Sequence, residues 1–430
     1  MAFLGMRGTG DWATDERPLN WRQGILYLYP NGTAPLTAIL SKMGESKVDD
    51  PQFHWWTKTL ATQRATITGR YTNAVLDAAY VSGAVAGDVL YLKMSAADSG
   101  HFREGHQVLL RDASDLTVDV NAKVVDVVTN GASSYIAAKL LEDDDNGTGG
   151  THDLSDCDTA LICGNINAEG APIPDAIAYD PTKWYNYTQI FRTPLEITRT
   201  AMRTKLRTAD SYKEAKREAL ELHSIEMEKA FLYGIRSENT GSNGKPERTT
   251  GGLLWAIRAG ASDNVNDFSL NTDYSGQTWL QGGEDWLDSY LELVFRYGSQ
   301  DKLAFVGSGA MLGVQKLAKT YGNIQLQPTT TSYGIKVVQW ITPFGVISMK
   351  IHPLFSYEAT TRNAMLIFEP AMLKYRFIDD TMFKPDPAMK KAGFTAYDGT
   401  KEEWLTECGL EYHHPTKFGF LSGFNTDSAV

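Results

Sequence analysis

One glycine-rich turn in this sequence contains residues that could bind a phosphate group. Gly307 and Gly309 follow the apolar run 303–306 and precede a helical pattern, an order typical of the turn that binds the phosphates of a dinucleotide. Their spacing differs from that fingerprint, and the residues around Gln325, about twenty positions further on, offer no acidic group for a ribose. Close packing between strand and helix explains the glycines, and a nucleotide-binding enzyme stays an alternative.

A second candidate is the acidic run 142–145, which partly resembles a calcium-binding loop. Alternate oxygen ligands precede Gly147, as they do in such loops. However, no helical pattern flanks the run, and Asp153 stands where the closing glutamate of a calcium loop belongs. The run is therefore predicted to be the solvated tip of a hairpin.

The remaining reactive groups are scattered. Cys157, Cys163 and Cys408 are too few and too irregular for a disulfide framework or a zinc site, so they are interpreted as buried small residues of a protein in a reducing cytoplasm. The adjacent His413 and His414 would point to opposite faces of a strand and cannot share a metal. No hydrolase, zinc-protease, phosphate-loop or C-x-x-C motif occurs. The sequence predicts no catalytic residue, no metal and no cofactor.

The element that must position everything else is a long predicted helix, Ser211–Tyr233. Its first residue and Glu214 form a capping box, and Gly234 supplies a stop. On a helical wheel the charged residues, Glu228 among them, share one arc, and the apolar residues, Leu222 among them, lie on the other side. One broad side is therefore predicted to be buried. At 1.5 Å per residue the rod would be about 35 Å long, enough to support several separate pieces.

Length and charge limit the class of protein. At 430 residues the chain is long enough for two or three domains. No apolar run reaches the ~20 residues that span a bilayer, and the first ten residues lack the apolar core of a signal peptide, so no membrane association is expected. With 41 Lys and Arg against 52 Asp and Glu, the net charge of −11 argues against tight nucleic-acid binding but permits proximity to DNA.

Residues 1–64 do not read as a compact domain. Pro30 and Pro35 are among several residues that break the short apolar runs of this stretch and favour an extended path. An extended arm with Trp55 and Trp56 would be unstable alone, so it should lie on a core or on a neighbouring molecule.

The next two stretches have strand patterns. Residues 65–165 contain short apolar runs separated by turn residues, which predicts an inserted antiparallel barrel or sandwich. Residues 166–197 alternate polar and apolar residues as a β-ribbon does, and Pro181 and Pro194 would confine that ribbon to sheet edges. The runs of the inserted domain are Val89–Leu92, Gln107–Arg111, Ala122–Val128 and Tyr135–Leu141.

After the long helix, the patterns alternate between loop, helix and strand. Residues 237–252 are predicted to be a loop because Gly, Ser, Asn and Thr dominate them. Residues 284–297 form a second amphipathic pattern, and the stretch 333–355 alternates like paired strands.

The order of these parts resembles the major capsid proteins of tailed bacteriophages, which share the HK97-like fold. The most specific pieces are the arm phrase PNGTAPLTAILSKMGESKVDDPQFHWW and the ribbon phrase QIFRTPLEIT that leads into the long helix. The resemblance covers nearly the whole chain in the order of its elements. It is strongest to the subgroup whose extended loop carries an inserted β-domain.

The resemblance implies an α+β, HK97-like capsid fold. It has an N-terminal arm, an extended β-ribbon, a long spine helix, an axial α/β domain and an inserted β-barrel-like domain. Residues 198–256 and 363–430 would form the peripheral domain, and residues 257–362 the axial domain that meets its copies around five-fold and six-fold positions. The ribbon and arm would lie over neighbouring subunits. The implied inter-subunit contact residues are Trp55, Trp56, Trp184, Tyr185, Tyr187, Phe191 and Arg192.

The implied function is structural, without enzymatic activity. Subunits would form pentamers and hexamers of an icosahedral head that encloses double-stranded DNA in the virion, after assembly in the host bacterial cytoplasm. An acidic balance suits such a shell, because an adhesive lining would obstruct DNA packaging. No charged helical segment precedes the arm as a built-in scaffold, so the implied partners are a separate scaffolding protein, a portal, a decoration protein and non-specifically bound DNA. An encapsulin-type compartment is a further alternative.

Overall fold

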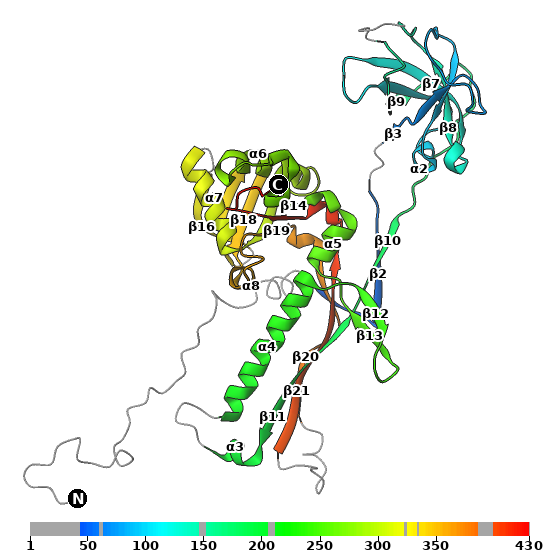
Figure 1. The fold of residues 1–430 in the computed structure, drawn as a ribbon. Coiled ribbons are helices and arrows are strands. Elements are labelled where there is room, and N and C mark those ends of the chain that lie inside the picture. The colour runs from blue at the N-terminus through cyan, green and yellow to red at the C-terminus, as the bar shows by residue number, and fades with distance from the viewer. Residues whose placement is uncertain are drawn as a thin grey trace, which may run out of the picture. The chain divides into compact units, whose positions relative to one another are not determined.

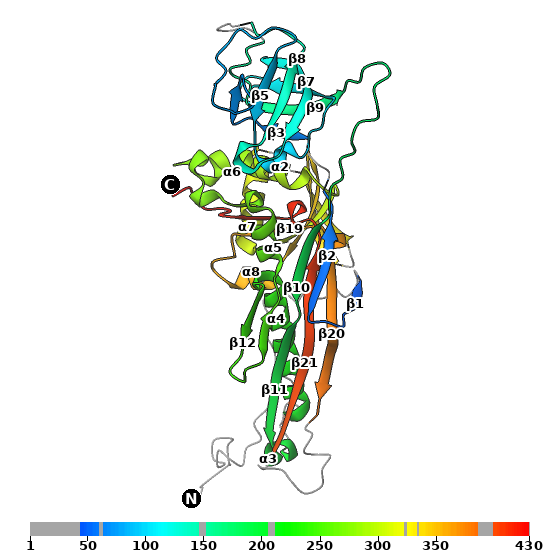
Figure 2. The same cartoon turned by 90° about the vertical axis from the view of Figure 1, so that its right-hand side faces the viewer.

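The computed structural model describes residues 44–59, 63–145, 152–204, 211–321, 325–332, 335–385 and 399–429. The chain divides into two compact units: Met1–Trp55 with Lys183–Val430, called the body here, and Trp56–Thr182, called the barrel domain (Figures 1 and 2). Each unit is built around hydrophobic clusters of its own. Most of the expected arm, 1–43, lies outside the described residues.

The long helix is confirmed as α4 (Ser211–Tyr233), which packs along a four-stranded sheet of the body (Figure 2). Strands β11 and β21 are antiparallel over their full paired length, and β1 pairs in parallel with β20. The side chain of Ser211 lies outside the described residues, so its capping box stays a prediction. In order across the sheet, the strands are β1 (Glu45–Lys47), β20 (Leu373–Lys384), β21 (Gly399–Tyr412) and β11 (Gln189–Thr198).

Two residues of α4 depart from the helical-wheel prediction. Leu222 is 51% exposed although it was expected on the buried side, and Glu228 is buried although it was expected on the charged arc. The carboxylate of Glu228 is 2.5 Å from Nε2 of His352, and this partner makes the burial of its charge tolerable. The wheel misses this pair because the partner lies far away in the sequence.

The second part of the body is an α/β lobe with a seven-stranded sheet. One face of its strand β15 presents Leu303 and Phe305 to the cluster at the end of α4, and the other presents Ala304 and Val306 to helices α6 and α7. In order across the sheet, the strands are β14 (Val265–Asp267), β22 (Gly419–Ser422), β19 (Met365–Phe368), β15 (Asp301–Val306), β18 (Gly345–Ile351), β17 (Ile335–Thr342) and β16 (Gln325–Ser332).

The other helices of the body are short or cover the lobe. The amphipathic pattern at 284–297 is confirmed as the second half of α6, which begins earlier because Thr278 and Gln281 form a capping box. The other helices are α3 (Arg199–Arg203), α5 (Leu253–Gly260), α6 (Trp279–Phe295), α7 (Ser308–Tyr321) and α8 (Pro353–Tyr357).

Two pairs of strands were not predicted from the sequence. Strand β2 (Gln52–Thr57) pairs with β10 (Thr182–Tyr187), so the end of the expected arm is one strand of the ribbon. The loop prediction at 237–252 is wrong for β12 (Ser237–Thr240) and β13 (Pro246–Thr249), which form a hairpin. Cross-strand bonds around its glycine-containing turn outweigh the weak strand propensity of the sequence.

The barrel domain confirms the predicted β-rich insertion. The edge strands β3 and β4 of its sheet are separated by only two residues, Ile67 and Thr68, whose N–H groups donate to carbonyls of Asp158 (2.7 Å) and Lys93 (2.8 Å). One bent segment thus closes the sheet into a barrel. In order, the strands are β3 (Arg64–Thr66), β9 (Thr159–Asn165), β6 (His106–Arg111), β7 (Asp119–Val128), β8 (Tyr135–Leu140), β5 (Val89–Lys93) and β4 (Gly69–Tyr71), with a short helix α2 (Ala96–Ser99).

The acidic run follows β8, and its carboxylates fasten a neighbouring loop. Asp144 is buried rather than solvated, because it accepts hydrogen bonds from the Tyr80 hydroxyl and the Gly83 N–H, and Asp143 accepts one from the Ala86 N–H. The described residues contain no group of three metal-ligating side chains. Gly147 lies outside the described residues.

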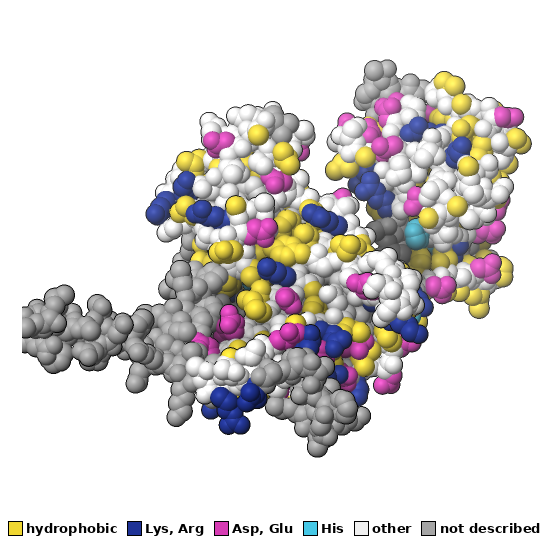
Figure 3. Space-filling view, turned by 60° about the horizontal axis from the view of Figure 1, so that its bottom comes forward, with side chains coloured by type: hydrophobic (Ala, Val, Ile, Leu, Met, Phe, Trp, Pro, Cys, Tyr) yellow, Lys and Arg dark blue, Asp and Glu magenta, His cyan; other side chains and the backbone are white. Residues whose placement is uncertain are grey.

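The surface of the body is mixed in character. On the face that Figure 3 shows, basic and acidic side chains alternate and hydrophobic side chains gather between them. Among the described residues, every helix is too short or too polar to cross a bilayer.

Candidate functional site

The two tryptophans of strand β2 lie in opposite environments. Successive side chains of a strand point to opposite faces, and here Trp55 is 5% exposed whereas Trp56 is 60% exposed. Trp55 contributes to the core at the end of α4, and Trp56 offers its indole ring to solvent. The adjacent pair therefore combines an anchor within the chain with an exposed aromatic surface.

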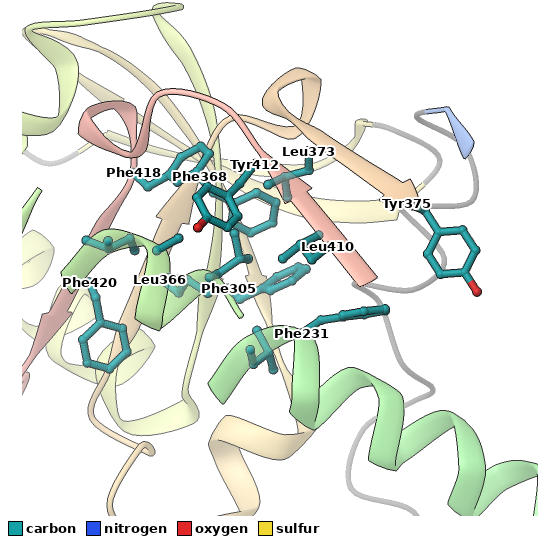
Figure 4. Packing of buried hydrophobic residues seen from close by; sticks show 14 of the residues in the cluster. Phe231, Phe305, Leu366, Phe368, Leu373, Tyr375, Leu410, Tyr412, Phe418 and Phe420 are labelled. Carbon is teal, nitrogen blue, oxygen red and sulfur yellow. The ribbon is translucent and has the colours of Figure 1, made fainter. Parts of the chain in front are cut away.

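An aromatic cluster fixes the base of the ribbon to the body. Its centre is Tyr412 of β21, which is fully buried and belongs to the same core as Phe231 of α4 (Figure 4). The ring of Trp55 meets that of Tyr412 edge-on at 5.1 Å between centroids, and the ring of Trp184 lies 6.2 Å away. Edge-to-face pairs of this kind add about 0.5–1.5 kcal/mol beyond burial. They orient both ribbon strands against β21.

Tyr185, the next residue of the ribbon, is held by a cation. The guanidinium of Arg236, just beyond the end of α4, lies 3.8 Å from the centroid of the Tyr185 ring and 4.5 Å from that of Trp255. Its Nη1 also donates to the carbonyl of Tyr185 at 2.9 Å. The ribbon is thus tied to the segment that follows the long helix.

Asn186 is the polar centre of the same junction. It is fully buried, and its Nδ2 lies within 3.2 Å of three acceptors, the hydroxyl of Thr250 and the carbonyls of Gly251 and Leu410. Its Oδ1 accepts hydrogen bonds from the N–H groups of Tyr187 (2.9 Å) and Gly251 (2.8 Å). One side chain therefore joins β10, the segment before α5 and β21.

Strand β11 continues the ribbon and buries one face under α4. Phe191 is 6% exposed and packs beside the ring of His223. The two nitrogens of this histidine meet the hydroxyls of Thr193 (3.0 Å) and Thr406 (2.7 Å), and burial lowers its pKa. Phe191 and His223 therefore hold the sheet to α4.

The outer face of β11 carries Ile190 and Arg192. Ile190 is 59% exposed, and the guanidinium of Arg192 forms an ion pair with Glu403 at 2.6 Å while most of its side chain faces solvent. An isoleucine so exposed on a regular strand is typical of a contact surface when other apolar groups lie nearby.

The entry of the arm is fixed by a buried charge. Glu411 of β21 accepts hydrogen bonds from Arg376 and, at 2.7 Å, from Nε2 of His413. Burial alone would raise the pKa of Glu411, but these two partners lower it. Arg376 also donates to the hydroxyl of Ser46, so β1 is held at the edge of the sheet.

The seven residues implied as contacts fall into three groups. Trp55 and Phe191 lie in the core of their own chain, which gives them a packing role within the subunit. Trp56 and Arg192 are exposed. The remaining three, at the base of the ribbon, are partly buried: Trp184, Tyr185 and Tyr187.

Sequence reasoning missed Ile190 and Asn186 as site residues. The two-residue alternation of β11 was enough to find Ile190, since it shares a face with Arg192. Nothing in the sequence around Asn186 distinguishes it from other asparagines. Its partners come from three distant segments.

The glycine-rich turn is explained by close packing. A Cβ atom at Gly307 would overlap the carbonyl group of Arg362, and one at Gly309 would overlap the side chain of Asn363. The backbone of the loop before β19 therefore occupies the space that a phosphate would need.

A long helix on a four-stranded sheet, an α/β lobe and an anchored ribbon are the parts of a shell-forming structural subunit with the HK97-like fold. The model of the SU10 major capsid protein family matches residues 8–425, and the chain belongs to that family. It is a structural protein of the phage capsid, a shell that is assembled from many copies of it, and it is not an enzyme.

Individual relatives are distant in sequence. The chain is 24% identical to a major capsid protein of Pseudomonas phage PaMx41 over 413 aligned residues. The alignment covers 93% of this chain and 90% of that protein. Among solved structures it is similar to a chain of Microbacterium phage Oxtober96, with 9% identity and a TM-score of 0.46 over 96% of this chain and 98% of that chain. A chain of Mycobacterium phage Bobi has 8% identity and a TM-score of 0.44 over 95% and 96%.

Proposed function

We propose that copies of this chain form the pentamers and hexamers of an icosahedral head that encloses packaged double-stranded DNA. Residues 257–362 act as the axial domain around the symmetry axes, and residues 198–256 with 363–430 act as the peripheral domain. Membership of a capsid family supports this assignment. The two parts of the body, a helix-covered lobe and a sheet with a long helix, are consistent with these roles.

The observation that carries the proposal is the exposure of Trp56 beside an immobilised ribbon base. A tryptophan offers about 150–250 Å² of surface, and 60% of that of Trp56 remains accessible in the single chain. Covering it with a neighbouring copy would stabilise each contact by about 2–4 kcal/mol. Because the Tyr412 cluster and Asn186 fix the ribbon base beforehand, little conformational entropy is lost on association.

The proposed contact between neighbouring copies is centred on three exposed residues, Trp56, Ile190 and Arg192. The partly buried residues at its rim are Trp184, Tyr185 and Tyr187. Trp55 and Phe191 act from beneath by holding the strands in place. The expected arm, 1–64, and the ribbon are assigned to the surface between neighbouring subunits.

The further partners of the proposal are a separate scaffolding protein, a portal, a decoration protein and DNA bound without sequence preference. Assembly takes place in the cytoplasm of the host bacterium. The net charge of −11 supports weak rather than adhesive contact with DNA, because a strongly basic lining would bind the phosphate backbone tightly.

The test is to produce the full chain, alone and with a scaffolding protein, and to examine it by size exclusion and negative-stain electron microscopy. Closed shells or rings of five and six subunits are expected. Trp56→Ala should reduce assembly, whereas Leu116→Ala, which removes an exposed apolar group of the barrel domain, should not. Protein that stays monomeric under every condition, or a Trp56→Ala variant that assembles like the unmodified chain, would contradict the proposal.

A further inference from the structure

We propose that helix α6 of one copy binds helix α7 of the next copy within a ring of subunits, through side chains of opposite charge. The surface on α6, called the acidic stripe, consists of Leu280, Glu284 and Asp288. The surface on α7, called the basic stripe, consists of Leu312, Lys316 and Lys319. This inference rests on the proposed ring-forming function and names the two surfaces that would close the ring.

The acidic stripe is one continuous row on α6. Its residues are spaced by four, so they lie on one side of the helix, and Leu280 at its start is 41% exposed. Burial and the neighbouring carboxylates of Asp288 and Asp285 raise the pKa of Glu284, and burial and Asp285 raise the pKa of Asp288. No basic group of the described residues contributes to either shift. Among the described residues, neither carboxylate forms an ion pair, so the negative charge of the stripe is left uncompensated by this part of the chain.

The basic stripe has the same layout with the opposite sign. Leu312 is 42% exposed, and Lys316 and Lys319 follow at intervals of four and three, on the side of α7 away from the core. The ammonium group of Lys316 donates to Oδ1 of Asn425 at 2.6 Å, a neutral acceptor. Each stripe thus begins with an exposed leucine and continues with two charges of one sign.

A small pocket beside the acidic stripe adds an apolar component. It has a volume of about 220 Å³. Its walls are Glu284, Leu287 and Asp288 of α6 and residues 340–343 around the end of β17, so apolar groups and the two stripe carboxylates line it together. Small-molecule sites are usually about 300–1,000 Å³. This pocket is below that range and suits one side chain of a partner, such as a lysine of a basic stripe, whose aliphatic stem would lie on the apolar walls while its ammonium group meets the carboxylates.

The two stripes cannot neutralise each other within one subunit. Both helices bury their inner sides against the same face of the lobe, and the indole N–H of Trp279 in α6 donates to the carbonyl of Gly313 in α7 at 3.1 Å. The stripes lie on other sides of these helices, and no ion pair joins them in the described part of the chain. Two different, complementary surfaces on one subunit are what a head-to-tail ring requires.

Charge reversal in the full-length chain tests the inference. Glu284→Lys with Asp288→Lys, or Lys316→Glu with Lys319→Glu, should each lower the fraction of protein found in rings and shells by at least about tenfold, because like charges then meet at every contact. The chain with all four substitutions should assemble again to within about threefold of the unmodified protein. Tryptophan fluorescence melting checks that each variant is folded.

A mixture of the two reversed variants gives a sharper result. One variant then has two positive stripes and the other two negative stripes, so contacts form only between unlike variants. An alternating ring closes with six members but not with five, so the mixture should form hexamers without pentamers or closed icosahedral shells.

The matched control for the reversed acidic stripe is Glu104→Lys with Glu169→Lys, which changes the net charge by the same amount on the exposed surface of the barrel domain. It should assemble normally. Reversed variants that assemble like this control, or a fourfold variant that remains as impaired as either pair, would overturn the inference while leaving the proposed function intact. If the unmodified chain forms neither rings nor shells, alone or with a scaffolding protein, the proposed function itself fails.

Discussion

Replacing Asn186 by alanine should destabilise the body strongly, although it removes only a small polar group. The side chain is fully buried and meets five backbone or hydroxyl partners at the base of the ribbon. Its loss leaves the N–H groups of Tyr187 and Gly251 and the carbonyl of Leu410 without this partner in a buried region.

The magnitude follows from these three groups. A buried polar group that loses its partner costs about 1–3 kcal/mol, and water that enters the space left by the amide recovers part of this. We therefore expect Asn186→Ala to lower the free energy of unfolding of the body by about 2–4 kcal/mol. The ribbon base should also become more mobile, so assembly should decrease as well.

Urea unfolding of the unassembled chain, followed by tryptophan fluorescence, is the suitable assay. Of the ten tryptophans only Trp56, at the border with the body, belongs to the barrel domain, so this signal reports mainly the body. Asn239→Ala, at an exposed position of β12, is the control and should change the stability by less than about 0.5 kcal/mol. A loss below about 1 kcal/mol for Asn186→Ala would refute the reasoning, since it would mean that its partners are satisfied without it.

Three further predictions concern the same fold. Burial lowers the pKa of His223 below 6.5, so at lower pH the unfolded chain binds a proton that the folded chain does not, and stability should fall as the pH drops below about 6.5. His223→Gln should flatten that pH dependence in urea titrations at pH 7.5 and 5.5, and an unchanged dependence would contradict the prediction. Replacing residues 58–181 by a short Gly-Ser linker should leave the fluorescence melting of the body within a few degrees, because the two units have separate cores; loss of cooperative melting would contradict this. Gly307→Ala should destabilise the body by about 1–3 kcal/mol in urea, because its methyl group meets the backbone at Arg362, and a neutral result would show that the loop can move aside.

Local patterns in the sequence were enough for the elements that carry strong periodicity. The bounds of α4 agree with the prediction at both ends, because a capping-box sequence, a long amphipathic run and a glycine all mark them in the sequence. Four strands of the barrel, β5, β6, β7 and β8, were also found, since turn residues separate their apolar runs, whereas β3, β4 and β9 were not predicted.

Elements that depend on partners far away in the sequence were not predictable. Nothing local shows that β2 pairs with β10, because the two strands are separated by the whole barrel domain. The hairpin of β12 and β13 is weak in strand propensity, and its cross-strand bonds decide its structure.

The same limit applies to the contact residues. Sequence reasoning placed Trp55 and Trp56 together, and strand alternation implies that only one can face the core. Trp55 is the one that faces the core, because its ring packs edge-on against that of Tyr412, which lies more than three hundred residues later in the sequence. How exposed a charged or aromatic side chain is depends on the folded chain. Only the structure shows that Trp55 is a buried anchor and that Trp56 is exposed.

Strand β11 lies at one edge of its four-stranded sheet over ten residues, with only β21 beside it in the described part of the chain. Such an open edge is a template on which further chains can add as strands, and a protein made in many copies is especially exposed to that route of aggregation. Pro194, near the middle of the strand, has no N–H to offer to an incoming strand. The proline thus removes one of the donors that edge-to-edge pairing of newly made subunits would use, which disfavours that route of aggregation.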